Sequence, residues 1–300
     1  MNSGLTIGIY GGGPLYSGGP GVIDDLRASG FTTVVAWSVH VETNGDLVFN
    51  DPPIVQGGKY VGNPGWPAQL AALKQPPTSV NRLIFSVGAG GVQDFTNVAK
   101  LIASQGTGPS SVLYRNFAAL RQTIPEIDAI DFDDEDLYDL PTIVKFAQML
   151  HEIGFSVTFC PWTDVGFWTK CLKALNTPTD HVVTQFNLQC YSGGAGNDPS
   201  TWIKAVGAAM GPSFDAKGFV FPGLGAALWD SKAKTCTMPN RDGYYCPADL
   251  GGRLAGWRTT GIQGGWVWLL DAVLNCQTSG ICRGAMGTAA YAAAVRAALT

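Results

Sequence analysis

Charged residues are scarce in this chain and form no basic cluster. Lysine, arginine, aspartate and glutamate make up 14% of the 300 residues, and the formal net charge is −4, whereas a typical globular protein has about 25% charged residues. No run of lysine and arginine is present to neutralise phosphates, so we expect no nucleic-acid partner. Hydrophobic residues reach 46%, which excludes disorder as the main state.

The chain also lacks a long apolar run and a recognisable leader. No segment approaches the roughly 18 consecutive apolar residues of a membrane span, so we expect a soluble protein without a membrane partner. The amino terminus, M-N-S-G-L-T-I, has neither the charged region nor the apolar region of a signal peptide.

Metal-binding and nucleotide-binding patterns are missing as well. No C-x-x-C motif occurs, and His40, His151 and His181 are scattered along the chain. Zinc needs clustered cysteine and histidine ligands, so we expect no metal and no other cofactor. The glycine-rich stretches 11–13 and 88–91 match neither nucleotide-binding motif and are interpreted as turns.

Cysteine spacing predicts two short-range disulfides and an oxidising compartment. Cys236 lies ten residues before Cys246, and Cys276 lies six residues before Cys282, both in polar, turn-rich stretches, so these neighbours are expected to pair. Disulfides indicate a secreted protein whose leader is absent from this sequence; a cytosolic protein with reduced thiols is the alternative. The other cysteines are Cys160 and Cys171, whose pairing stays open, and Cys190, expected to be a free thiol in a strand.

Short apolar runs alternate with segments of helical period along the whole chain. The expected strands are Leu5–Tyr10, Thr33–Trp37, Arg82–Val87, Ile127–Phe132, Ser156–Phe159, Val183–Cys190, Gly218–Pro222 and Gly264–Leu270. The expected helices are Val22–Ala28, Pro67–Lys74, Val112–Gln122, Thr142–Ile153, Phe167–Leu175, Thr201–Ala209, Leu250–Thr259 and Ala289–Leu299. This α/β pattern favours a single (β/α)8 TIM barrel over residues 1–300, because parallel strands need crossover helices.

Two polar segments are expected to be loops within that barrel, which has no large insertion domain. Residues Asn44–Gly65 read as an inserted loop after the second strand, and Ser231–Pro247 as a disulfide-stapled loop after the seventh. The alternative architecture is a doubly wound open sheet.

The segment Ile127–Tyr138, I-D-A-I-D-F-D-D-E-D-L-Y, gathers carboxylates at the end of the fourth predicted strand. Because side chains alternate along a strand, Asp131, Asp133 and Glu135 share one face. Active sites of barrels lie at the carboxyl ends of the strands, where repulsion and burial raise the pKa of at least one such acid. The structural alternative is a solvated acidic loop or a helix N-terminus. By the same parity Asp128 points towards the helices and is interpreted as structural.

The chain resembles glycoside hydrolase family 18, the chitinases and their relatives. The D-x-x-D-x-D-x-E signature of that family is matched by Asp128, Asp131, Asp133 and Glu135. Three further motifs match in chain order, so that the resemblance covers about residues 5–270: S-V-G-A at Ser86–Ala89 is similar to S-x-G-G, Q-C-Y-S at Gln189–Ser192 to Q-x-Y-N, and G-G-W-V-W at Gly264–Trp268 to G-G-x-x-x-W.

The resemblance implies substrate-assisted catalysis. Glu135 would be the general acid and base, and Asp133 would orient the 2-acetamido group of the sugar, whose carbonyl oxygen is the nucleophile. Asp131 would share a proton with Asp133, and Tyr191 would hydrogen-bond the acetamide oxygen. Trp268 would form the floor under the sugar, followed by a cis peptide bond.

Aromatic residues at predicted strand ends complete the candidate site, because sugar rings stack their C–H faces on aromatic rings. The expected substrate-binding residues are Tyr10, Trp37, Trp162, Gln189 and Trp268. For Trp37 and Trp162 a place in the core is an equal alternative. Gln189 in place of methionine resembles the short-loop, hevamine-like branch, which cuts internally.

The sequence departs from the family pattern at three positions. They are Ala129 in place of glycine, Asp134 in place of a bulky apolar residue, and Ser192 in place of aspartate or asparagine. The function implied is a secreted, monomeric, endo-acting chitinase that hydrolyses polymers of β-1,4-linked N-acetylglucosamine. The alternatives are an endo-β-N-acetylglucosaminidase acting on N-glycans, a branch that often has asparagine at the position of Asp133, and a non-catalytic chitin-binding lectin of the same fold.

Overall fold

The computed structural model describes residues 4–239 and 241–300, which divide into two compact units. Unit 1 comprises residues within 1–35, 73–82 and 186–300, and unit 2 comprises residues 36–72 and 83–185. No helix in the described ranges is long and apolar enough to cross a membrane. The prediction of one domain over residues 1–300 stays a prediction.

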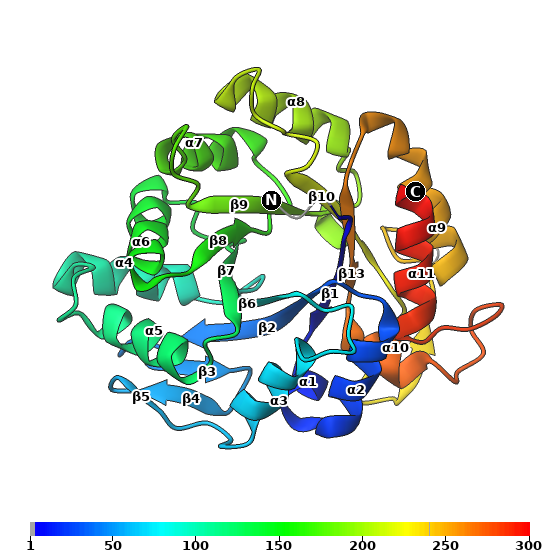
Figure 1. The fold of residues 1–300 in the computed structure, drawn as a ribbon, viewed down its shortest axis with the longest axis horizontal. Coiled ribbons are helices and arrows are strands. Elements are labelled where there is room, and N and C mark those ends of the chain that lie inside the picture. The colour runs from blue at the N-terminus through cyan, green and yellow to red at the C-terminus, as the bar shows by residue number, and fades with distance from the viewer. Residues whose placement is uncertain (1–3, 240) are drawn as a thin grey trace. The chain divides into compact units, whose positions relative to one another are not determined.

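Eight strands form a sheet whose order closes on itself (Figure 1). They are β1 (Thr6–Gly11), β2 (Thr33–Val41), β6 (Arg82–Gly88), β7 (Ile127–Asp133), β8 (Ser156–Phe159), β9 (Val183–Gln189), β10 (Val220–Gly225) and β13 (Gly264–Trp268). The order is β1-β13-β10-β9-β8-β7-β6-β2, and β1 also pairs with β2. The predicted (β/α)8 barrel is therefore confirmed, and each predicted strand is present with small changes at its ends.

Helices follow the strands as the sequence period predicts. They are α1 (Gly13–Ser17), α2 (Pro20–Ser29), α3 (Trp66–Leu73), α4 (Asp94–Gln105), α5 (Val112–Thr123), α6 (Leu140–Ile153), α7 (Val165–Leu175), α8 (Pro199–Met210), α9 (Pro247–Gly256), α10 (Leu270–Cys276) and α11 (Thr288–Leu299). In unit 2, α6 packs against α4, α5 and α7; in unit 1, α11 packs against α9 and α2 (Figure 1). The sequence did not predict α4 or the short helices α1 and α10. For α4 the reason is that Thr96, Asn97 and Val98 in its first turns have weak helix propensity.

Local signals explain the ends of the helix that follows the fourth barrel strand. Asp139 caps the start of α6, since its carboxylate accepts hydrogen bonds from the backbone N–H and the hydroxyl of Thr142, at 3.0 and 2.6 Å. Gly154 ends the helix with a φ of 104°, a conformation that suits glycine. The buried face of α6 places Phe146 on Phe132 of β7, with stacked rings 5.0 Å apart.

The polar segment after β2 is more ordered than the sequence predicts. It contains β3 (Leu47–Phe49), β4 (Pro53–Gln56) and β5 (Lys59–Tyr60), and β3 pairs antiparallel with the extended end of β2. Leu47 and Phe49 are buried and alternate with half-buried positions. The expectation of a plain loop over 44–65 was therefore wrong. The segment 231–247 likewise contributes β12 (Thr235–Thr237), which forms a hairpin with β11 (Leu228–Asp230).

The disulfide pairing predicted from spacing is wrong. The bonds join Cys236 to Cys276 and Cys246 to Cys282, with Cα atoms 5.7 Å apart in each pair. The β11–β12 hairpin carries Cys236 to the end of α10, where its sulfur lies 3.8 Å from the carbonyl oxygen of Asn275. Both bonds thus tie the segment after β10 to the segment after β13, a proximity that exists only in the folded chain.

Two of the other cysteines are free thiols buried in the protein. Cys171 and Cys190 form no disulfide, so the open Cys160–Cys171 pair does not form, and the free thiol expected at Cys190 is confirmed. Burial raises the pKa of Cys171 to about 12 and also raises the pKa of Cys190. Thiolates are the reactive species, so both side chains are protected from alkylation.

Peptide mapping tests this arrangement. Without reductant we expect cross-linked peptides that contain Cys236 with Cys276 and Cys246 with Cys282. Cys171 and Cys190 should resist iodoacetamide at pH 8 in the native protein and react once it is denatured. Cross-links between Cys236 and Cys246, or full alkylation of the native protein, would contradict the structure.

Candidate active site

The register of three neighbouring strands places Asp131 between two hydroxyl groups. Asp131 on β7 lies beside Ser86 on β6 and beside Thr158 on β8. The hydroxyls of Ser86 and Thr158 donate to its two carboxylate oxygens, at 2.8 and 2.5 Å. All three side chains are completely buried. The two hydrogen bonds fix the position of the Asp131 carboxyl group.

Asp133, two residues along the same strand, faces both a donor and another acid. The indole N–H of Trp37 donates to Asp133 at 3.0 Å, and the carboxyl of Asp133 shares a side-chain hydrogen bond with Glu135. Burial raises the pKa of Asp133 well above its ordinary value, and the charges of Glu135 and Asp131 raise it further. The carboxyl groups of Asp131, Asp133 and Glu135 therefore interact, and ionisation of one disfavours ionisation of its neighbours.

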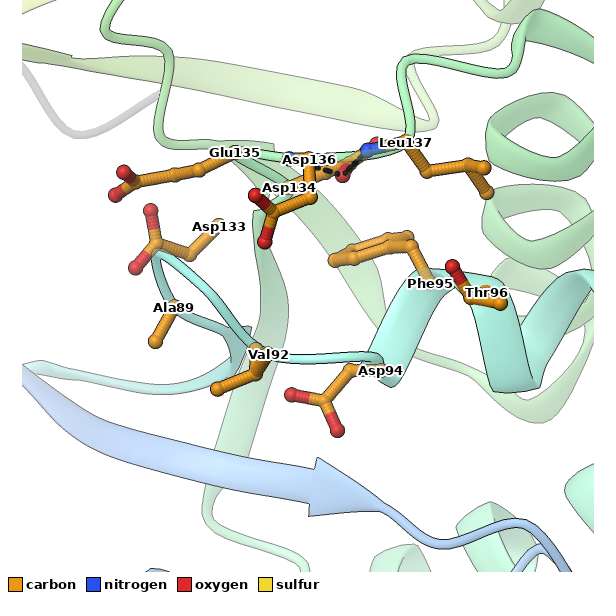
Figure 2. A pocket seen from close by; sticks show the side chains of 10 residues that line it. All are labelled: Ala89, Val92, Asp94, Phe95, Thr96, Asp133, Asp134, Glu135, Asp136 and Leu137. Carbon is orange, nitrogen blue, oxygen red and sulfur yellow. Dashed lines mark hydrogen bonds between the residues drawn. The ribbon is translucent and has the colours of Figure 1, made fainter.

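Glu135 follows the end of β7 and lines a small cavity in unit 2. Figure 2 shows its carboxyl group beside that of Asp133, both pointing in the same direction. The cavity has a volume of about 10 Å³ and is bounded by the loop after β6 and the start of α4. Gly90 approaches Glu135 so closely that an added Cβ would lie 2.9 Å from its carboxylate oxygen. The half-buried acid is thus enclosed on one side by backbone.

Gly88 fixes the turn that enters this loop. It has a φ of +105°, and a Cβ there would lie 2.3 Å from the carbonyl oxygen of Asp133. Only glycine fits this position without displacing the strand that carries the acids.

Asp134 has a role that the sequence did not reveal. Its side chain is buried and accepts hydrogen bonds from the backbone N–H groups of Asp136, Leu137 and Tyr138, at 3.2, 2.9 and 3.0 Å. Burial raises its pKa, and these hydrogen bonds oppose the rise. Asp134 therefore holds the loop in which Glu135 lies, which explains an acid at a position where the family that the sequence resembles has an apolar residue.

Replacing Asp134 should destabilise the protein. We expect Asp134→Ala to lower the free energy of unfolding by about 2 to 4 kcal/mol, because three backbone donors lose their buried acceptor. Asp134→Asn keeps one amide oxygen and should cost less. Urea denaturation of the two variants measures the difference, and equal stability of Asp134→Ala and the parent protein would contradict this role.

Asp128 lies apart from the three acids, at the beginning of β7. Its carboxylate accepts a hydrogen bond from the backbone N–H of Leu83 at 2.7 Å, where the β6–β7 register shifts. The contact is a structural one within the sheet, in agreement with the interpretation of Asp128 from strand parity.

Unit 1 holds a separate cluster of aromatic rings at the ends of its strands. The ring centroid of Tyr10 lies 4.4 Å from that of Trp266 and 5.8 Å from that of Trp268. Tyr191 stacks on Trp268, with centroids 5.5 Å apart and planes 17° from parallel. The peptide bond after Trp268 is cis, as predicted. Tyr10 and Tyr191 are buried, whereas Trp268 is half-buried.

Trp266 and Tyr244 are members of this cluster that the sequence did not single out. The Tyr244 ring packs edge-on against Tyr191, and its hydroxyl lies 2.9 Å from that of Ser192. Ser192 has a φ of +48°. Tyr244 lies within the segment joined by the disulfides, so it reaches Tyr191 from 53 residues further along the chain. Ser192, which replaces the aspartate or asparagine of the family pattern, therefore has the Tyr244 hydroxyl as its hydrogen-bond partner.

Of the remaining predicted residues, Gln189 and Trp162 lie at or just after strand ends, whereas Trp37 lies in the middle of a strand. Trp37 lies within β2 and is half-buried, as is Trp162, which follows β8. Gln189 is the buried last residue of β9 in unit 1. In unit 2 the structure brings together Trp37, Asp131, Asp133 and Glu135. In unit 1 it brings together Tyr10, Tyr191 and Trp268. That the two groups face one substrate stays a prediction.

Comparisons with known proteins relate the chain to chitinases by fold. No family model matches the sequence, and no curated protein matches it. Among solved structures, the GH18 chitinase of Pseudoalteromonas aurantia superposes with a TM-score of 0.63 at 11% identity, over 98% of this chain and 99% of that one. The GH18 chitinase of Cycas revoluta, in complex with allosamidin, gives 0.58 at 13% identity, over 97% and 99%.

A third similar structure is the chitinase-like agglutinin of Robinia pseudoacacia. Its TM-score is 0.58 at 13% identity, over 96% of this chain and 98% of that one. At such identities the likeness concerns the fold. The chain has the (β/α)8 fold of the GH18 chitinases, the family that its sequence motifs resemble.

Proposed function

We propose that the protein is a glycoside hydrolase of the GH18 type, an endo-acting chitinase that cleaves β-1,4-linked N-acetylglucosamine with retention. The observation that carries the proposal is the pair formed by Glu135 and Asp133. A buried carboxyl with a raised pKa that is hydrogen-bonded to a half-buried glutamate is the arrangement that general acid catalysis requires near neutral pH.

The residues of unit 2 account for the two proton transfers. Glu135 protonates the glycosidic oxygen while the carbonyl oxygen of the substrate's own acetamide attacks C1 and the C1–O bond breaks. Glu135, now a carboxylate, then removes a proton from water, which attacks C1 and opens the cyclic intermediate. Asp133 orients the acetamide and balances the positive charge on its nitrogen, and Asp131 supplies further negative charge. Two displacements at C1 give a product with the original β configuration.

The aromatic cluster of unit 1 provides the sugar-binding part of the proposal. Tyr191 hydrogen-bonds the acetamide oxygen, and Trp268 stacks under the sugar ring. Tyr10, Gln189, Trp37 and Trp162 are further substrate-binding residues in this proposal. The Cycas revoluta chitinase, which has a similar fold, has been crystallised with a trimer of N-acetylglucosamine, which supports an oligosaccharide of this sugar as ligand.

Two features of the proposal concern the state of the protein. The disulfides support a secreted enzyme, because they persist in oxidising compartments. Recovery of the active protein from cells rather than from the culture medium would contradict secretion.

We also propose that the protein is a monomer, which light scattering tests against a mass of 31.6 kDa.

A lectin is the competing function, because one protein of similar fold is an agglutinin. Incubation with the hexamer of N-acetylglucosamine, a high-mannose glycopeptide, deacetylated chitosan and cellohexaose separates the candidates. We expect internal cleavage of the N-acetylated hexamer and none of chitosan or cellohexaose, which lack the acetamide nucleophile. Cleavage of the glycopeptide alone would indicate an endo-β-N-acetylglucosaminidase, and binding without hydrolysis would indicate a lectin; either result would overturn the proposal.

A further inference from the structure

A second network of polar side chains lies on the wall of the Glu135 cavity. The Nδ1 atom of His40, on β2, lies 2.8 Å from a carboxylate oxygen of Asp94, the first residue of α4. The other carboxylate oxygen of Asp94 accepts a hydrogen bond from the backbone N–H of Val41 at 2.8 Å. Nε2 of His40 lies 3.2 Å from the hydroxyl of Ser38. No pattern in the sequence connects these residues.

The order serine, histidine, aspartate is that of a hydrolytic triad, but the burial of the serine excludes this use. Ser38 has no exposed surface, whereas a nucleophile must reach its substrate. The network must therefore act on its surroundings through its charges and hydrogen bonds.

A shared cavity and a neighbour in the chain link this network to the catalytic acids. Asp94 lines the same cavity as Asp133 and Glu135, and Figure 2 shows it at the amino end of α4, across the loop after β6 from the other two carboxyl groups. Ser38 directly follows Trp37, whose indole N–H donates to Asp133. A charge at Asp94 thus acts on a site that already contains several carboxylates.

We infer that His40 is a positioning residue that cancels the charge of Asp94 and thereby keeps the proton affinity of the Glu135–Asp133 pair within its working range. The consequence for catalysis rests on the proposed function, but the electrostatic effect does not. Without the imidazolium, the uncompensated Asp94 carboxylate raises the pKa of Glu135, because a like charge disfavours ionisation.

The groups around His40 and around the Glu135 cavity support a charged imidazolium at His40 and a raised pKa of Glu135 when that charge is lost. The hydrogen bond to Asp94 raises the pKa of His40, burial opposes the rise, and the charges of Glu42 and Asp51 add to it. His40 therefore keeps its charge to a higher pH than a free imidazole. The charged residues that line the described cavity are Asp94, Asp133, Asp134, Glu135 and Asp136. All of these are acids, and His40 is the cation that lies against one of them.

Carbon-13 NMR of the glutamate carboxyl groups measures the effect directly. The chain has four glutamates, and the Glu135 signal is assigned by its loss in Glu135→Gln. We expect His40→Gln to raise the titration midpoint of Glu135 by about 0.3 to 1 pH unit. The double variant His40→Gln/Asp94→Asn, which is neutral again, should return the midpoint close to that of the parent protein.

The control is the surface pair of His151 and Asp180, which lie 3.2 Å apart on the same unit. His151→Gln should leave the Glu135 midpoint unchanged. An unchanged midpoint in His40→Gln, or a double variant shifted as far as the single one, would overturn the inference, since disrupted packing alone gives no recovery in the double variant.

Linkage offers a second measurement if His40→Gln does not fold. Coupling between two titrating sites is reciprocal, so Glu135→Gln should lower the midpoint of the His40 imidazole, followed by nitrogen-15 NMR. An unchanged His40 midpoint would overturn the inference. Failure of the wild-type protein to hydrolyse any saccharide would instead overturn the proposed function and leave both titrations interpretable.

Discussion

Glu135→Gln is expected to reduce kcat on N-acetylglucosamine oligomers by about 10² to 10⁴, the usual contribution of general acid catalysis. Glutamine has the shape of glutamate and can keep a hydrogen bond to Asp133, but it has no proton to give to the leaving oxygen. The affinity for oligosaccharide should therefore change little, and the loss should appear in kcat.

A matched control is available in the same unit. Glu152→Gln makes the same chemical change at an exposed position of α6 and should leave kcat unchanged. Turnover of Glu135→Gln near that of the parent protein would mean that Glu135 is not the acid and that the carboxylate cluster has another purpose.

Asp133→Asn is expected to have the second largest effect, a loss of about 10² to 10³ in kcat, because it removes charge where the transition state becomes positive. It should also change the pH profile. Asp133 and Glu135 each disfavour the ionisation of the other, so a residue that cannot ionise at position 133 lowers the pKa of Glu135 and moves the basic limb of the profile to lower pH.

The direction of that movement separates an electrostatic role from a structural one. The amide of asparagine can still accept the hydrogen bond from the Trp37 indole, which keeps the side chain in place. A profile reduced in height without any movement of the basic limb would contradict the coupling between Asp133 and Glu135.

The shared face of the carboxylates on β7 could be predicted from the sequence, because the alternation of side chains along a strand depends only on neighbouring residues. The motif placed Asp131, Asp133 and Glu135 on one side of β7, and the structure brings Asp133 and Glu135 into hydrogen-bond contact. The partners of Asp131 could not be predicted in this way. Thr158 reaches Asp131 only through the register of β8 on β7, which depends on packing over the whole sheet.

Errors in the sequence-based predictions arose where residues distant in the chain meet. Spacing favoured Cys236 with Cys246, yet the hairpin of β11 and β12 carries Cys236 to Cys276, 40 residues away. Tyr244 joins Tyr191 for the same reason, since the segment that carries it is held by the disulfides. Asp134 was interpreted as a departure from the pattern of the family that the sequence resembles, whereas its three backbone hydrogen bonds anchor the loop that carries Glu135.

The central claim is that hydrolysis takes place by two displacements at C1, with Glu135 as the acid. Proton NMR of the products formed in the first minutes from the hexamer of N-acetylglucosamine tests it most directly, because the two anomers are distinguished before they interconvert. Two displacements at C1 predict the β-anomer as the first product. The α-anomer as the first product would contradict the account.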